Sequence, residues 1–193
     1  MSKVQIIIAS TRPGRVGPYV ADWIQKEAVQ HGGFDQVELV DLAEVNLPFM
    51  DEPNHPRLGR YEHQHTKDWS ALIASADAYV FVMPEYNYGF NAPLKNALDY
   101  LNAEWRYKAV GLASYGGVAA GTRAANMVKQ VISGLKMVPT FEAVQIPFVH
   151  QFIDEEGVFT PNEVLLAAAK GMFDEMVKLD GALKVLREAP KQD

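Results

Sequence analysis

The sequence contains no cysteine, and this absence removes several classes of chemistry at once. Disulfide bonds, thiolate zinc sites, iron–sulfur clusters and a cysteine nucleophile all need the missing thiol. Long apolar runs are missing too: the first, VQIIIAS, is too short to span a bilayer and lacks an export cleavage site. We therefore expect a cytoplasmic protein without a membrane partner.

The chain also lacks an excess of positive charge. Eighteen lysines and arginines stand against twenty-four aspartates and glutamates, which gives a net charge of −6. Such a balance argues against nucleic acid or an anionic membrane surface as the main partner. Any bound anion must therefore be held by a local arrangement of donors rather than by the overall field.

What the sequence does contain is enough apolar material for one full core. Its 193 residues are 48% hydrophobic and 22% charged, within the usual range for a globular domain. Neither an internal repeat nor a low-complexity tract interrupts the pattern. The whole chain, 1–193, is therefore predicted to fold as a single domain.

Short apolar runs and helical patterns alternate along the chain. The runs resemble strands buried on both faces and cover Val4–Ala9, Val37–Leu42, Asp77–Met83, Lys108–Ser114 and Ala143–Pro147. Helical periodicity lies between them; Pro18 and Gly32 mark the ends of the first helix, and a capping-box spacing from Thr160 opens the last. The alternation predicts an α/β fold with a five-stranded parallel sheet and helices on both faces.

In a sheet of this kind, ligands bind beyond the carboxyl ends of the strands. Three loops leave those ends: Ser10 to Gly17, Pro84 to Phe90 and Tyr115 to Ala120. The first, STRPGRVG, combines hydroxyls, arginines and glycines ahead of a helix N-terminus, which suits a phosphate monoester. It is neither a Walker loop nor G-x-G-x-x-G, so nucleoside triphosphates and Rossmann-type dinucleotides lose support. A solvated surface turn is the alternative.

The second and third loops suit a planar ligand. Pro84 is expected to end its strand, and the EYNY that follows offers ring faces and amide groups to a heteroaromatic ring. Gly116 and Gly117 let backbone amides approach a ligand closely. Taken singly, the second loop could be an aromatic dimer contact and the third an ordinary strand-helix turn. Together, the three loops predict a site for a phosphorylated planar cofactor.

These residues resemble the motifs of the NAD(P)H-dependent FMN reductases, a flavodoxin-like family that includes chromate, quinone and azo-dye reductases. STRPGR, PEYNYGFNAPLKNALDYL and SYGG match in order and spacing, from the first strand to about Gly121. The resemblance implies bound FMN, NADPH or NADH as electron donor, and quinones, azo compounds or free flavin as acceptors. It implies cofactor binding by Ser10, Arg12, Arg15, Val16 and Gly17 at the phosphate, by Pro84, Glu85, Tyr86, Asn87 and Tyr88 along the flavin and ribityl chain, and by Ser114, Tyr115, Gly116 and Gly117 at the pyrimidine edge.

In such an enzyme the flavin carries the chemistry, so we predict no catalytic side chain and no metal. Donor and acceptor would use one flavin face in turn, giving ping-pong kinetics, while Gly116 and Gly117 would stabilise the reduced ring through N–H groups. Tyr88 departs from the family pattern and would narrow the substrate face. Two other classes stay open: a flavodoxin-type electron carrier, against which the arginine pair argues, and an FMN-free interaction protein that uses the aromatic loop.

Two further expectations concern assembly and one long connection. We expect a homodimer or homotetramer, because the family assembles and because Tyr86, Tyr88 and Phe90 would otherwise stand in water. The connection 43–64 is unusually long and is interpreted as a lid over the flavin or a partner contact. Its histidines, with His65 just beyond, match no common zinc spacing and are interpreted as solvated.

Overall fold

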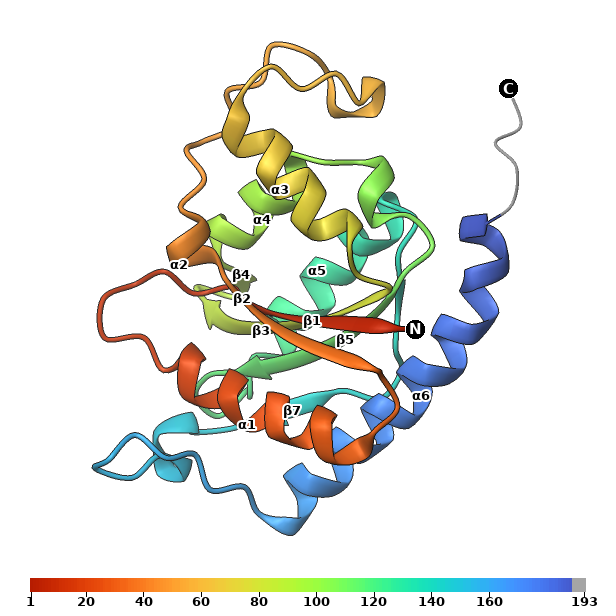
Figure 1. Ribbon diagram of the computed structural model, residues 1–193. Coiled ribbons are helices and arrows are strands. Elements are labelled where there is room, and N and C mark those ends of the chain that lie inside the picture. Colours follow the sequence, from red (N-terminus) through yellow and green to blue (C-terminus); the bar gives the residue numbers. More distant parts are fainter. Residues whose placement is uncertain (189–193) are drawn as a thin grey trace.

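The structure is a computed structural model, and it describes residues 1–188 of the chain (Figure 1). One sheet contains all the strands: β1 (Lys3–Ile8), β2 (Gln36–Asp41), β3 (Ala78–Tyr86), β4 (Gly89–Phe90), β5 (Ala109–Tyr115), β6 (Val138–Pro139) and β7 (Val144–Ile146). Its main path runs β2-β1-β3-β5-β6, with every neighbouring pair on it parallel. The doubly wound, flavodoxin-like order implied by the sequence is confirmed.

The prediction of five strands is wrong in number, although the central strands are as expected. The fifth run forms only β7, which pairs with the end of β5, while β6 pairs with its beginning. Between β6 and β7 the Thr140 hydroxyl donates to the Glu142 carbonyl at 2.7 Å, which turns the chain out of the sheet. The other added strand, β4, pairs antiparallel with β3.

Helices cover both faces of the sheet, as predicted. Their bounds are α1 (Gly17–His31), α2 (Leu42–Val45), α3 (Gln64–Ala74), α4 (Ala92–Asp99), α5 (Thr122–Gly134) and α6 (Glu163–Glu188), with short 3₁₀ turns η1 (Pro56–Leu58), η2 (Ala103–Trp105) and η3 (Val149–Phe152). Figure 1 shows α1 and α6 on one face and α3, α4 and α5 on the other. Within residues 1–188, no helix has the length and apolar character needed to cross a membrane.

Alternation along the strands divides the buried side chains into two cores. Ile6 packs with α1 and α6, whereas its neighbour Ile7 faces the aromatic core that contains Trp69 and Trp105. Both faces of β1 are therefore buried, which is why its sequence reads as a continuous apolar run.

The helix boundaries follow local signals with one exception. Helix α1 has Pro18 in its first turn and ends at Gly32, which has φ of 67° and donates its N–H to the Ala28 carbonyl. At the start of α6, the Asn162 carboxamide accepts the Leu165 N–H at 2.9 Å. The predicted Thr160 cap is therefore wrong, because Asn162 takes that role closer to the first helical residue.

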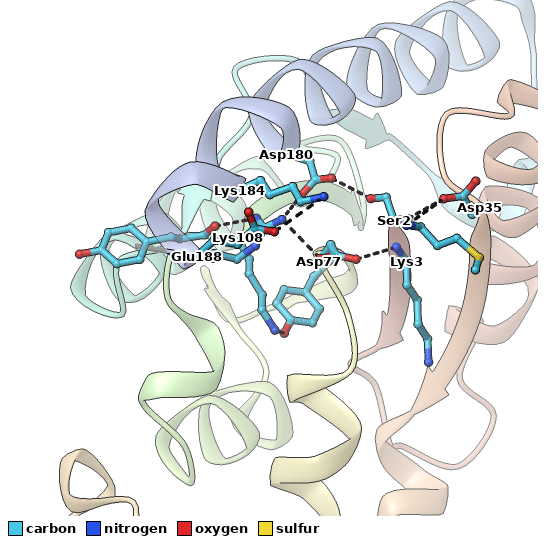
Figure 2. A network of polar contacts seen from close by, with 12 residues as sticks. Ser2, Lys3, Asp35, Asp77, Lys108, Asp180, Lys184 and Glu188 are labelled. Carbon is cyan, nitrogen blue, oxygen red and sulfur yellow. Dashed lines mark hydrogen bonds and ion pairs between the residues drawn. The ribbon is translucent and has the colours of Figure 1, made fainter. Parts of the chain in front are cut away.

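A polar network fastens α6 to the amino ends of the strands (Figure 2). The Ser2 hydroxyl donates to Asp180 at 2.7 Å, and the Lys3 backbone N–H donates to Asp77 at 2.9 Å. Arg187 donates to Asp180 at 2.6 Å and reaches Asp77 at 3.4 Å. This edge of the sheet is thereby closed by structural contacts, which leaves the carboxyl edge for a ligand.

Lys108 is buried at the same amino edge, 6% exposed. Its Nζ donates to the Ile73 carbonyl at 3.0 Å and to the Tyr79 hydroxyl at 2.8 Å. Burial, and then the neighbouring Arg187 charge, lowers the pKa of Lys108 from 10.5 to about 8. Keeping this ammonium charged inside the fold therefore costs stability at neutral pH.

We expect Lys108 to contribute a rise in the unfolding free energy between pH 8 and 10.5. In that window the unfolded chain keeps the Lys108 proton while the folded chain has lost it, so higher pH favours folding. Near pH 10 this rise is opposed by the tyrosines whose pKa is raised in the fold, Tyr61, Tyr79, Tyr100 and Tyr115, so the contribution of Lys108 is measured as the difference between wild type and variant. Lys108→Met should flatten this rise and stabilise the fold at pH 7 by about 1–3 kcal/mol. The Ile73 carbonyl stays paired, because the Tyr79 hydroxyl also donates to it at 2.7 Å. Denaturant unfolding from pH 7 to 10.5 measures both effects; an equal slope in the variant would contradict them.

Candidate functional site

A cavity of about 410 Å³ opens at the carboxyl edge of the sheet, and its volume lies in the range of small-molecule sites. The three predicted loops and η3 enclose it. The lining residues are Arg12, Arg15, Val16, Pro84, Glu85, Tyr86, Tyr115, Gly116, Gly117, Phe148, Val149, His150 and Gln151. The first nine were predicted from the sequence; Ser10, Gly17, Asn87, Tyr88 and Ser114 were predicted too but do not line it.

One end of the cavity is suited to an anion. The Arg15 N–H donates to the Arg12 carbonyl at 3.1 Å across Pro13 and Gly14, whose φ is 70°, as in a type II turn. Helix α1 follows with no side-chain cap, so the N–H groups of its first turn face outward without a side-chain partner. The exposed Arg12 guanidinium makes no ion pair or hydrogen bond with residues 1–188.

Arg15 is committed elsewhere. Its guanidinium forms a bidentate ion pair with the Asp41 carboxylate, and Nη1 also donates to the Ser10 carbonyl at 2.6 Å. The hydrogen bond to Asp41 raises the pKa of Arg15. Burial opposes ionisation of Asp41, but the bonds from Arg15 and the Ala43 N–H outweigh it and lower the pKa of Asp41. Arg15 lines the cavity with its charge compensated, and it ties the first loop to the end of β2.

Ser10 and Gly17, the two ends of the first loop, do not line the cavity. The Tyr115 hydroxyl donates to the fully buried Ser10 Oγ at 3.2 Å. A Cβ at Gly17 would lie 2.5 Å from Ser10 Oγ and 3.0 Å from Tyr115 Oη, so glycine is required there. Burial raises the pKa of Tyr115 to about 12. The neutral Tyr115 phenol therefore fixes the start of the first loop through its hydrogen bond to Ser10.

The prediction that Pro84 ends its strand is wrong, because β3 continues to Tyr86. Beyond Val82, which is paired with Ile8, β1 no longer accompanies β3, so the N–H that proline lacks is not needed on that side. The chain then turns back into β4 through Asn87 and Tyr88, which have φ of 49° and 70°. Positive φ at both positions is the signature of a type I′ hairpin turn.

Arg123, at the start of α5, holds this hairpin. Its Nε pairs with Glu85 at 2.6 Å, its backbone N–H donates to Glu85 at 3.1 Å, and its guanidinium lies 3.8 Å from the centre of the Tyr88 ring. Tyr88 therefore points to Arg123 rather than into the cavity, and its predicted narrowing of the substrate face has no geometric support. Phe90 was expected to stand in water, but it packs against the aromatic core.

The third loop offers one free donor rather than two. The Gly116 N–H already donates to the Ile146 carbonyl at 3.3 Å, whereas the Gly117 N–H has no partner in the described part of the chain. Ser114 is buried, and its hydroxyl donates to the Ala120 carbonyl at 2.9 Å. Of the two glycine amides that the sequence predicts as donors, only that of Gly117 is without a partner among residues 1–188.

The fourth wall, Phe148 to Gln151, was not predicted from the sequence. The N–H groups of Phe148 and Val149 donate to the Gly117 and Gly116 carbonyls at 3.2 and 3.4 Å, which fixes η3 against the third loop. A signal was available: the fifth predicted strand ends at Pro147, and its loop must leave the same edge of a parallel sheet.

The connection 43–64 does not line this cavity. Part of it borders a second cavity of about 470 Å³, together with Thr11 and the start of α4. The Asp51 carboxylate accepts the Tyr100 hydroxyl at 2.9 Å and contacts the His65 ring at 3.0 Å, so calling His65 merely solvated is wrong. Among residues 1–188, no three histidine or acidic side chains are grouped to hold a metal.

Comparison with known proteins identifies relatives of this chain. Residues 2–151 match the family model described as NADPH-dependent FMN reductase. An NAD(P)H-dependent FMN reductase of Schizosaccharomyces pombe is 39% identical over 181 residues, 90% of each chain, and one from a Nectria species is 34% identical over the full length of both. The solved structure of FerB, a flavoenzyme NAD(P)H:(acceptor) oxidoreductase from Paracoccus denitrificans, superposes with a TM-score of 0.73 over 94% of this chain and 98% of that one, at 20% identity.

Proposed function

Because the chain belongs to the NADPH-dependent FMN reductase family, we propose that it passes electrons from NADPH or NADH through bound FMN to small-molecule acceptors. The observation that supports this most directly is the single cavity in which an uncompensated arginine and an uncapped helix meet an aromatic wall and a free backbone N–H. A phosphate monoester and a planar ring carrying acceptor atoms need that donor set.

The residues of the cavity would divide the binding of FMN between them. Arg12 and the first turn of α1 would hold the phosphate, and Arg15 would keep that loop in place through Asp41. Pro84 and Tyr86 would lie along the ring, and the Gly117 N–H would donate to its pyrimidine edge, where negative charge grows on reduction. Bound FMN would supply the redox chemistry, hydride acceptance from nicotinamide and two-electron donation to an acceptor.

An electron carrier without turnover is the less favoured alternative. The relatives that share most of the chain are named as NAD(P)H-dependent reductases. The anion-suited end of the cavity carries Arg12, whose exposed guanidinium makes no ion pair or hydrogen bond with residues 1–188. The flavodoxin fold alone does not distinguish carrier from enzyme.

The acceptors would be quinones, azo compounds or free flavin. Besides Arg12 and Gln151, the cavity walls present rings, small residues, one histidine and two charged side chains that are already paired, Arg15 and Glu85. Among residues 1–188, no metal-binding group is present to select a particular acceptor. Nicotinamide and acceptor would then occupy one site in turn, because the aromatic wall and the proposed flavin site belong to the same cavity.

Steady-state kinetics test this proposal. We expect purified protein to bind FMN with a flavin absorption spectrum, and NADPH or NADH oxidation against several acceptors to give parallel double-reciprocal lines. Intersecting lines would contradict a site used in turn. Protein that binds FMN but does not oxidise either nicotinamide would favour the electron carrier.

We also propose a homodimer or homotetramer, measurable by light scattering. Phe90 does not support this assembly, because it packs against the aromatic core. Exposed apolar surface does support it: Tyr88 is 71% exposed, and the exposed Met127 lies against the adjacent Gly89. A cytoplasmic location stays a prediction from the sequence.

A further inference from the structure

Two aromatic side chains line the cavity on opposite sides of β5. Tyr86 lies at the end of β3 and Phe148 follows β7, and β5 pairs with both strands. The loop after β5, from Tyr115 to Gly117, therefore separates the two rings. Tyr86 is 40% exposed and Phe148 is 49% exposed, so each offers ring surface to a molecule that enters.

The backbone of Phe148 is in a conformation that suits other residues better. Its φ and ψ are 46° and 50°, in the left-handed region where a side chain crowds the backbone. The Phe148 N–H donates to Gly117 at 3.2 Å, and its carbonyl accepts the Gln151 N–H at 2.8 Å, so the surroundings hold this conformation. A glycine or asparagine would adopt it at lower cost.

Packing does not explain why an aromatic residue occupies this position. Tyr88 is also left-handed, but its ring lies on Arg123. No ring or cation in residues 1–188 stacks on Phe148, and its side chain belongs to neither core. An exposed ring held in a strained conformation at a cavity wall points to a ligand as its partner.

We propose that Phe148 determines substrate specificity by stacking on the planar ring of the nicotinamide or acceptor. This inference rests on the proposed function and deepens it. The aromatic surface that the sequence analysis assigned to Tyr88 is supplied instead by Phe148, from the other side of β5. Ring-bearing substrates should depend on it, whereas a small inorganic oxidant such as ferricyanide should not.

Three variants separate the ring from the backbone. Phe148→Asn and Phe148→Gly remove the ring and tolerate positive φ, so their unfolding temperatures should equal or exceed that of the wild type. Both should lower kcat/KM for NADPH and for a simple quinone about three- to ten-fold, the usual value of one stacked pair. Binding of NADP⁺ to the FMN-loaded protein should weaken by a similar factor. Phe148→Tyr should preserve all three values.

Two internal controls accompany these measurements. Ferricyanide reduction, measured at saturating NADPH, and the FMN dissociation constant should both stay within about two-fold of wild type, because neither needs the proposed stack. Tyr107→Asn is the matched variant: Tyr107 is also aromatic with φ of 57°, but it lies at the amino edge, where its carbonyl accepts from Arg187 at 2.9 Å. It should leave all of these constants unchanged.

The possible outcomes identify which idea has failed. Wild-type protein that neither binds FMN nor oxidises NADPH overturns the proposed function and this inference with it. An active wild type with unchanged Phe148→Asn kinetics overturns the inference alone. Equal losses in FMN affinity, or in ferricyanide reduction, would also overturn it, because the ring would then belong to the cofactor site.

Discussion

Arg12→Ala is expected to weaken FMN binding at least about ten-fold while leaving riboflavin binding almost unchanged, since one charge-assisted bond contributes about 1.5–3 kcal/mol. Arg12 lines the cavity, and its guanidinium makes no ion pair or hydrogen bond with residues 1–188, so the affinity lost should be that for the phosphate alone. The unfolding temperature should hardly move, because the side chain is exposed. Titration of flavin-free protein with each ligand at one salt concentration measures the effect.

Arg15→Ala provides the contrast, because the same charge is removed from the same loop. This change leaves the partly buried Asp41 carboxylate without its partner and frees the Ser10 carbonyl, so it should destabilise the fold by about 3 kcal/mol or more. FMN and riboflavin affinity should then fall together. If Arg12→Ala reduced the affinity for both ligands equally, the phosphate would have to bind elsewhere.

This division between the two arginines shows what the sequence could and could not supply. The alternation of apolar runs was sufficient to predict the sheet, its helical layers and three of the walls of the cavity. The partner of Arg15 lies in a different βα unit: it depends on the register of β1 and β2, which places Asp41 beside Ile8 and hence beside the first loop. Residue types alone cannot distinguish an arginine that braces a loop from one that binds a ligand.

The predictions for the second loop, Pro84 to Phe90, were wrong for a related reason. The missing N–H of Pro84 predicts a strand end, but the loss of this donor matters only where a neighbouring strand would have accepted it. Because the pairing of β1 with β3 ends at Val82, position 84 tolerates a residue without an N–H. Likewise, the aromatics of this loop were grouped as one surface, yet the type I′ turn places Tyr88 on Arg123, a residue of a helix that starts after the next strand.

Phe148 could have been found by topology without any contact information. Every parallel strand ends at the same edge, so the loop after the fifth apolar run belonged with the other three. Its residues resemble no phosphate-binding or amide-donor motif, so their types alone do not indicate a binding site. What distinguishes Phe148 is a backbone angle, which sequence does not display for a residue other than glycine or asparagine.

Gly121→Ala should strongly reduce the stability of the fold. Gly121 caps α5 with φ of 77°, and a Cβ there would lie 2.7 Å from the Tyr115 nitrogen and 2.8 Å from the Ser114 Cβ. These atoms belong to the end of β5 and cannot rotate away, so α5 must move from the sheet. Adding the cost of left-handed alanine, we expect a loss of at least about 3 kcal/mol.

The same displacement should reach the cavity, because the loop that carries the Gly117 donor lies between Tyr115 and Gly121. FMN affinity should therefore fall together with stability, and saturating FMN should recover part of the lost unfolding temperature by mass action. Gly134→Ala is the matched control: it lies on the same helix with no atom within 4 Å of its Cβ position, and it should be neutral or stabilise by about 0.5–1 kcal/mol. Equal unfolding temperatures for the two variants would mean that α5 and the end of β5 are not packed as closely as these distances require.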